Sequence, residues 1–105
     1  MSSKIRFEKE DDRYRIILAD PPLHILDTAL LVELREAMDR VEPDRPLLLI
    51  EAEGSKAFSA GASVQDHLGE RVGPMLEAFH GALRALHRLD LVSVAKVRGL
   101  CLGGG

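Results

Sequence analysis

The stretch Leu47-Leu48-Leu49-Ile50 decides the fold of this 105-residue chain. Turn-forming residues bound it on both sides, with Pro43 and Pro46 before it and Glu53-Gly54-Ser55 after it. Four consecutive apolar residues are too few for a helix, so the run is typical of a β-strand that is buried on both faces. Strands of this kind belong to parallel sheets covered by helices, and we therefore expect an α/β fold.

The sequence before this strand predicts a hairpin and a helix. Apolar and charged residues alternate between residues 4 and 20, and Asp11-Asp12 supplies a turn between two strands. Asp20-Pro21-Pro22 ends the second strand, because proline cannot donate to a β-ladder. Asp27 favours a helix N-cap. Apolar residues then recur every three or four positions and predict an amphipathic helix over residues 28–42: Leu30, Leu34, Ala37, Met38 and Val41.

A second helix and a further strand are predicted after the buried strand. The helix has Gly73-Pro74 near its start and apolar residues at helical spacing, namely Met75, Phe79, Leu83 and Leu86. Residues 91–97 form a β-branched run that Gly99 interrupts. In such an α/β succession the helices cross over between parallel strands. Because these sheets bind ligands at the carboxyl ends of their strands, a site is expected in the loops that follow residues 51 and 97.

Both of these loops are rich in small residues. Residues 56–64 read KAFSAGASV, and residues 97–105 read VRGLCLGGG. Small side chains allow backbone N–H groups to approach a ligand closely, and two such groups on one carbonyl oxygen stabilise the negative charge that it acquires. Either loop alone is more typical of a tight turn, whereas the two together indicate an oxyanion hole.

Taken as a pair, the loops resemble the crotonase family, which is also called the enoyl-CoA hydratase/isomerase superfamily. In that family a motif like residues 58–62 follows a buried strand, and a motif like residues 99–105 follows one helix later. Residues 17–27 resemble the family's opening strand and loop, with His24 where Asn is more usual. The resemblance implies a ββα spiral of which residues 1–105 are the amino-terminal portion (hairpin, helix, buried strand, helix, strand), truncated at the triple glycine.

The resemblance also implies roles for particular residues. The backbone N–H groups of Ala62 and Gly104 match the family's oxyanion donors, which hold a thioester oxygen while enolate-like charge develops beside it. Leu23 and Ala60 match positions that contact the CoA part of the substrate. Ser63 and Gln65 depart from the usual Asp and Lys. Residues 62–68 look most like hydratases that act on cyclic dienoyl-CoA thioesters.

The implied activity is enoyl-CoA hydratase or isomerase chemistry, which needs a general acid and a general base as well as the oxyanion hole. In the family these groups lie beyond the position of residue 105. Asp66 and His67 are candidate substitutes, although such residues are more often a solvated turn. His24 either lines the CoA entrance or caps its loop. The competing hypothesis is a non-catalytic fragment or an assembly-only chain that lacks the acid and base.

Composition and charge exclude several other classes of protein. The chain has 17 acidic residues and 14 Lys and Arg, which gives a net charge of −3. The two signs are mixed along the sequence, so it contains no cluster of basic residues of the kind that binds nucleic acid. The chain has neither a long apolar run nor a signal-like start, so no membrane contact and a cytoplasmic location are expected. Cys101 is the one cysteine and is expected to be buried. Neither a metal nor a cofactor is expected, apart from the CoA that forms part of the substrate. The family resemblance implies that the chain assembles as a homotrimer or hexamer.

Overall fold

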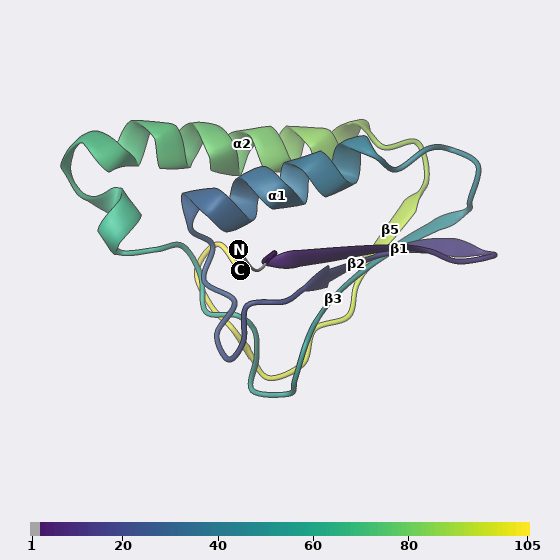
Figure 1. Ribbon diagram of the computed structural model, residues 1–105, viewed down its shortest axis with the longest axis horizontal. Coiled ribbons are helices and arrows are strands. Elements are labelled where there is room, and N and C mark those ends of the chain that lie inside the picture. Colours follow the sequence, from purple (N-terminus) through teal and green to yellow (C-terminus); the bar gives the residue numbers. More distant parts are fainter. Residues whose placement is uncertain (1–2) are drawn as a thin grey trace.

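The computed structural model describes residues 3–105, except for the side chain of His67. It confirms the α/β class that the sequence predicts, with helices between parallel strands (Figure 1). The elements in chain order are β1 (Ile5–Lys9), β2 (Arg13–Leu18), α1 (Thr28–Asp39), β3 (Leu47–Ala52), β4 (Ala57–Ser59), the 3₁₀ turns η1 (Gln65–His67) and η2 (Gly69–Arg71), α2 (Val72–Arg88), β5 (Val92–Ala95) and β6 (Leu100–Cys101).

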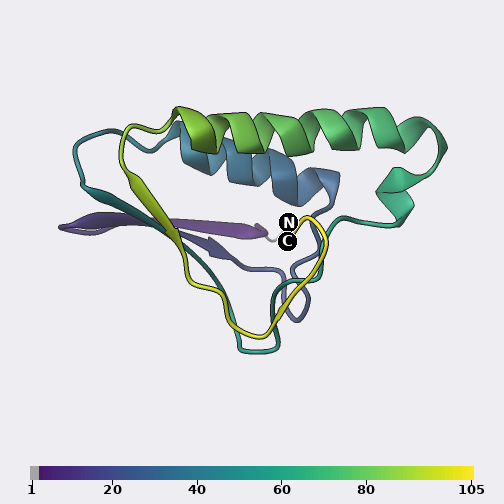
Figure 2. The ribbon, with the colours of Figure 1, turned by 180° about the vertical axis from the view of Figure 1, so that it is seen from behind.

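The main sheet has the strand order β1-β2-β3-β5. Strands β1 and β2 form the predicted antiparallel hairpin, and β3 pairs in parallel with β2 on one side and β5 on the other. Helices α1 and α2 lie next to each other over one face of this sheet, as both ribbon views show (Figure 2). Both helices therefore act as crossovers that cover the same face.

The core lies between the helices and this face of the sheet. Its largest fully buried side chains include Tyr14 and Ile16 of β2, Leu48 of β3 and Leu30 of α1. Asp27 is the N-cap of α1, as predicted, and its side chain accepts a hydrogen bond from Leu30 N at 2.8 Å. The helix ends before residue 42 because the N–H groups at 40 and 41 bond to carbonyls three residues back, which tightens the last turn.

Strand β3 is not buried on both faces, and this prediction was wrong. Leu48 is buried, whereas Leu47 and Leu49 on the opposite face are half-buried. That face carries ion pairs instead of an apolar layer, because Arg15 on β2 contacts both Glu8 and Glu51. Among residues 3–105 no helix covers this face, and the polar side chains make contact with water favourable.

A second, smaller sheet joins β4 to β6 in parallel just beyond the carboxyl ends of β3 and β5. Cys101 in β6 is exposed, which contradicts the expectation of a buried hydrophobe. The reason is that β6 pairs with β4 along one edge and no other described element covers it. Within residues 3–105, the helices are too short or too polar to cross a membrane.

Candidate functional site

The two small-residue loops lie against each other through their backbones. Leu100 N donates to Lys56 O at 3.0 Å, and Leu102 N donates to Ser59 O at 3.1 Å. The approach is so close that a Cβ atom on Gly99 would lie 2.3 Å from Lys56 O. The loops after β3 and β5 therefore meet at one edge, as their positions after adjacent parallel strands predict.

A third loop, residues 19–27, holds the other side of the segment that contains Ala62. Leu26 and Ala62 form an isolated parallel bridge in which Leu26 N donates to Gly61 O at 2.9 Å and Ser63 N donates to Leu26 O at 3.2 Å. In a parallel bridge the residue between the two bonded neighbours directs its own N–H toward the opposite edge. The N–H of Ala62 thus points away from Leu26, and it has no acceptor within the described part of the chain.

The triple glycine forms a turn beside this edge. Gly105 N donates to Leu102 O at 2.8 Å, and Gly103 has a φ of +53°, a conformation that glycine adopts without steric cost. Gly104 occupies the second central position of the turn, where an N–H is not used by the turn itself. No acceptor for Gly104 N is found in residues 3–105, and Gly104 is exposed. Both N–H groups singled out in the sequence are therefore unpaired in the described structure.

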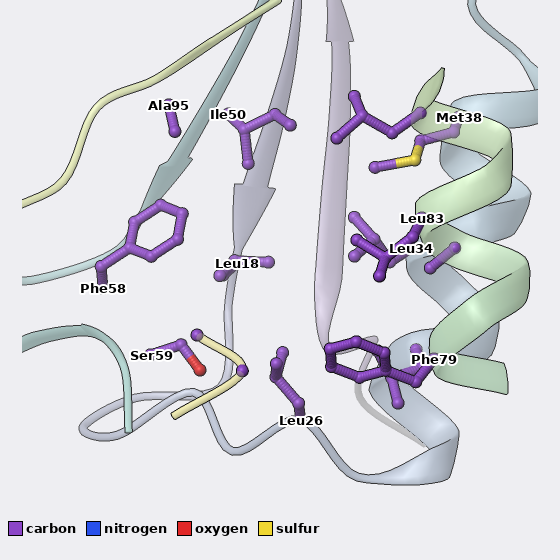
Figure 3. A pocket seen from close by; sticks show the side chains of 15 residues that line it. Leu18, Leu26, Leu34, Met38, Ile50, Phe58, Ser59, Phe79, Leu83 and Ala95 are labelled. Carbon is purple, nitrogen blue, oxygen red and sulfur yellow. The ribbon is translucent and has the colours of Figure 1, made fainter. Parts of the chain in front are cut away.

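An apolar cavity of about 190 Å³ opens next to the triple glycine (Figure 3). It lies between the sheet and the two helices, and Leu26, Phe79 and Leu83 are among its lining side chains. The ring of Phe79 packs against Gly104, since a Cβ atom at that position would lie 2.8 Å from Phe79 Cε2. Ser59 supplies the cavity's polar side chain. The cavity thus suits an apolar group whose polar end lies near Gly104.

Leu23 and Ala60, the predicted CoA contacts, lie next to each other. Ala60 N donates to Leu23 O at 2.9 Å, and both residues are half-buried. This bond and the Leu26 bridge together hold residues 60–63 along the third loop. Both residues also keep part of their surface exposed.

His24 is fully buried and both of its ring nitrogens are used within the protein. Its Nδ1 accepts a hydrogen bond from Asp20 N at 3.2 Å, so Nε2 is the nitrogen that donates to Glu53 O, at 2.9 Å. The carbonyl oxygen of His24 accepts a bond from Ser59 Oγ at 2.8 Å. The ring therefore braces its loop and is closed off from solvent in the described structure.

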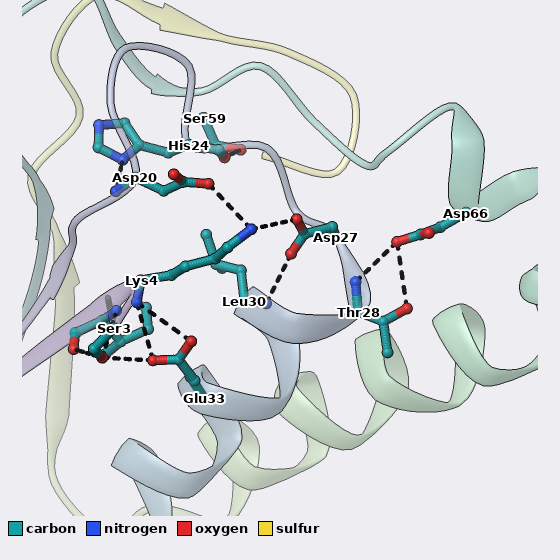
Figure 4. A network of polar contacts seen from close by, with 11 residues as sticks. Ser3, Lys4, Asp20, His24, Asp27, Thr28, Leu30, Glu33, Ser59 and Asp66 are labelled. Carbon is teal, nitrogen blue, oxygen red and sulfur yellow. Dashed lines mark hydrogen bonds and ion pairs between the residues drawn. The ribbon is translucent and has the colours of Figure 1, made fainter. Parts of the chain in front are cut away.

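An ion-pair cluster anchors the same loop to Lys4, the residue just before β1 (Figure 4). Lys4 Nζ lies 2.6 Å from Asp27 Oδ2 and 3.4 Å from Asp20 Oδ2, so it joins the two ends of the loop. The hydrogen bond to Asp27 raises the pKa of Lys4 above its ordinary value, while desolvation partly opposes this shift and the charge of Asp20 adds to it. Lys4 could not be identified from the sequence, because an alternating strand pattern contains no signal for a contact with a distant loop.

Asp66 is already engaged by the protein. Its Oδ2 accepts hydrogen bonds from Thr28 N at 2.9 Å and from Thr28 Oγ1 at 3.4 Å. The residue is half-buried, so it is neither a fully solvated turn residue nor an unpaired carboxylate. The side chain of His67, the other candidate, lies outside the described residues. Among the side chains that the structure describes, no three His, Cys, Asp or Glu residues are grouped as ligands for a metal ion.

Comparison with known proteins gives consistent matches over nearly the whole chain. A family model described as enoyl-CoA hydratase/isomerase matches residues 9–105. Cyclohexa-1,5-dienecarbonyl-CoA hydratase of Thauera aromatica is 34% identical over 97% of this chain and 40% of its own length. The solved structure of Pseudomonas aeruginosa DspI is 29% identical with a TM-score of 0.88, and the match covers 99% of this chain and 42% of that one.

A solved enoyl-CoA hydratase from Bacillus anthracis shows the shared fold at lower sequence identity. It is 24% identical with a TM-score of 0.86, over 97% of this chain and 42% of its own. The fold of the present chain is thus that of the amino-terminal part of these structures. The chain spans 40% of the length of the Thauera aromatica relative.

Proposed function

Because this chain belongs to the enoyl-CoA hydratase/isomerase family, the crotonase superfamily, we propose that it binds an acyl-CoA thioester and polarises its carbonyl group. The backbone N–H groups of Ala62 and Gly104 act as the oxyanion hole in this proposal. The observation that carries it is that both groups lie on loops in direct backbone contact and have no acceptor in residues 3–105.

The chemistry of the site supports this assignment. Hydration or isomerisation of an enoyl thioester places negative charge on the carbonyl oxygen while a proton is gained or lost at carbon. Two preorganised N–H donors stabilise that charge, and one such donor contributes about 2.7–4 kcal/mol to the transition state. The apolar cavity beside Gly104 accommodates the acyl group, while Leu23 and Ala60 contact the CoA portion.

Residues 1–105 form the amino-terminal part of the catalytic domain in this proposal. A general acid and a general base are needed in addition to the oxyanion hole, and Asp66 is occupied by Thr28. We assign the acid and base to the segment that follows residue 105 in the intact protein. The lengths of the relatives support this assignment. Coenzyme A enters only as part of the substrate, with no further cofactor.

Cyclic dienoyl-CoA thioesters are the proposed substrate class. The likeness of residues 62–68 to such hydratases and the match to cyclohexa-1,5-dienecarbonyl-CoA hydratase support this choice. Comparing turnover of a cyclic dienoyl thioester with turnover of crotonyl-CoA tests it. A higher kcat/KM for crotonyl-CoA would assign the protein to straight-chain substrates instead.

Replacing Ala62 by proline in the protein translated from the complete reading frame tests the oxyanion hole. The variant Ala62→Pro removes the N–H donor, and we expect turnover to fall about 100- to 1,000-fold, measured as loss of enoyl-thioester absorbance. Ala62→Ser is the matched control, because it changes the side chain at the same position and keeps the N–H donor, so a loss of turnover confined to Ala62→Pro is due to the missing donor. Undiminished turnover by Ala62→Pro would remove Ala62 from the site.

A second candidate function is assembly without catalysis by the 105-residue chain. Every residue of β5 is exposed, which favours contact with further protein at that edge. We expect this chain alone to leave an enoyl thioester unchanged, and loss of the thioester absorbance would exclude the non-catalytic candidate. The homotrimer or hexamer that the family implies is tested separately by light scattering of the intact protein.

A further inference from the structure

We propose that Asp66 is a positioning residue that fixes the direction of the Ala62 N–H. This inference rests on the proposed function of Ala62. It gives Asp66 a role that requires a hydrogen-bond acceptor and no proton transfer. The distinction can be tested, because an acid or base must change its protonation state during turnover and a positioning group need not.

Asp66 is attached to the start of α1. Its Oδ2 accepts from the backbone N–H of Thr28, which is the first residue of α1 and therefore has no partner within the helix. The two residues are 38 positions apart in the sequence, so the bond joins η1 to a distant helix (Figure 4). The positive end of the helix dipole also favours a carboxylate at this position.

A short segment, residues 63–65, joins Asp66 to Ala62. Asp66 N donates to Ser63 Oγ at 3.3 Å, so the short segment folds back on itself. On the other side of Ser63, the bridge between Leu26 and Ala62 ties the backbone to the residues just before α1. Residues 62–66 are therefore attached at both ends to the same platform, residues 26–28.

This double attachment fixes the peptide plane that carries the Ala62 N–H. The Leu26 bridge holds this peptide through Gly61 O and the following one through Ser63 N, but without the Asp66 bond residues 64–66 would be free to move and to draw Ser63 away from Leu26. The Asp66 bond removes that freedom, because Thr28 belongs to a helix packed on the core. Displacing a group that positions a reacting atom by about 1 Å can cost about 100-fold in rate.

The experiment compares Asp66→Ala, Asp66→Asn and the control Asp90→Ala in the protein translated from the complete reading frame. Asp90 is exposed and follows α2, so it has no part in the loop. Asn keeps an oxygen that accepts from Thr28 N but cannot transfer a proton as a carboxylate does. For Asp66→Ala we expect kcat to fall about 10- to 100-fold with KM changed less than about threefold. For Asp66→Asn we expect most of the activity and an unchanged pH–rate profile.

Hydrogen–deuterium exchange of residues 60–66 supplies a readout that does not depend on activity. We expect faster exchange in Asp66→Ala than in the wild type, with Asp66→Asn and Asp90→Ala close to the wild type. The inference is overturned if Asp66→Ala matches Asp90→Ala in exchange. It is also overturned if Asp66→Asn loses as much activity as Asp66→Ala and its pH–rate profile lacks one of the two limbs of the wild-type profile. An inactive wild type would reject the proposed function, and the exchange result would still decide whether Asp66 holds the loop.

Discussion

The carbonyl oxygen of Leu102 lies 2.9 Å from the point that a Cβ atom on Gly61 would occupy. Gly61 also has a φ of +102°, a backbone conformation that residues with a Cβ atom rarely adopt. A residue larger than glycine at this position would push the two loops apart. The spacing between the proposed N–H donors therefore depends on the absence of a side chain at residue 61.

We expect Gly61→Ala to destabilise the protein by about 1–3 kcal/mol and to lower turnover, because backbone strain adds to the clash with Leu102. Gly54→Ala is the matched control, since Gly54 has a φ of +76° but no atom within 4 Å of its Cβ position. Thermal denaturation of both variants measures the difference. Equal losses of stability would show that the contact with Leu102 has no effect.

Removal of the buried His24 ring is expected to lower the free energy of unfolding by a large amount. His24→Ala leaves Asp20 N and Glu53 O without their partners, and each unsatisfied buried group costs about 1–3 kcal/mol. His87→Ala serves as the control because His87 is exposed at the end of α2. Chemical denaturation should show a clearly lower free energy of unfolding for His24→Ala, and equal values for the two variants would contradict this account.

The carboxyl group of Asp44 predicts part of the pH dependence of stability. Hydrogen bonds from Lys9 and then from Tyr14 lower the pKa of Asp44 from 3.8 to about 2 in the folded protein. Because the pKa is lower in the folded protein, the stabilisation that charged Asp44 provides is fully present at pH values above its pKa in the unfolded chain. This stabilisation is lost as the pH falls from about 4 to about 2. Asp44→Asn should therefore unfold with a shallower pH dependence in that range.

The exposed Asp39 provides the control for this experiment. Tm values measured between pH 5 and pH 2 should separate Asp44→Asn from both Asp39→Asn and the wild type. The same slope in all three proteins would show that the Lys9 and Tyr14 contacts do not stabilise the charged form of Asp44.

One edge of β5 is paired with no strand among residues 3–105, which predicts self-association of the 105-residue chain. Strand β5 pairs with β3 along one edge, and its exposed valines include Val92 and Val94. Because an exposed apolar edge strand is a template for pairing, Val94→Lys should reduce association. Val32→Lys is a matched control, as Val32 is 46% exposed on α1 and Val94 is 44% exposed. Size-exclusion chromatography with light scattering measures the effect, and a monomeric wild type would contradict the prediction.

The local elements of the fold could be predicted from the sequence because their signals are local. Alternation and turn residues indicated the hairpin, and Asp27 with the following apolar spacing indicated α1. The uncovered face of β3 could not be predicted in the same way. An apolar run shows that a strand can be buried, but whether it is buried depends on neighbours such as Arg15, whose partner Glu51 is 36 positions away.

Part of the candidate site could also be predicted, because it too is marked by local signals in the sequence. Small residues after two neighbouring strands indicated where the backbone loops would meet, and the structure brings these loops into contact. The bond between Asp66 and Thr28 and the burial of His24 were not foreseen. Both depend on side-chain contacts between loops far apart in the sequence, and no periodic pattern marks such contacts.

The bonds that join the three loops around Ala62 consist mainly of main-chain atoms, as in the Leu26 bridge and the Leu102 to Ser59 contact. Such a framework tolerates substitutions at residues 60 and 62, because changes in these side chains leave its N–H and carbonyl groups in place. A library that randomises these two positions and spares Gly61 should therefore yield folded proteins with altered affinity for the CoA portion of the substrate. Evolution could vary the specificity of such a site without rebuilding its donors.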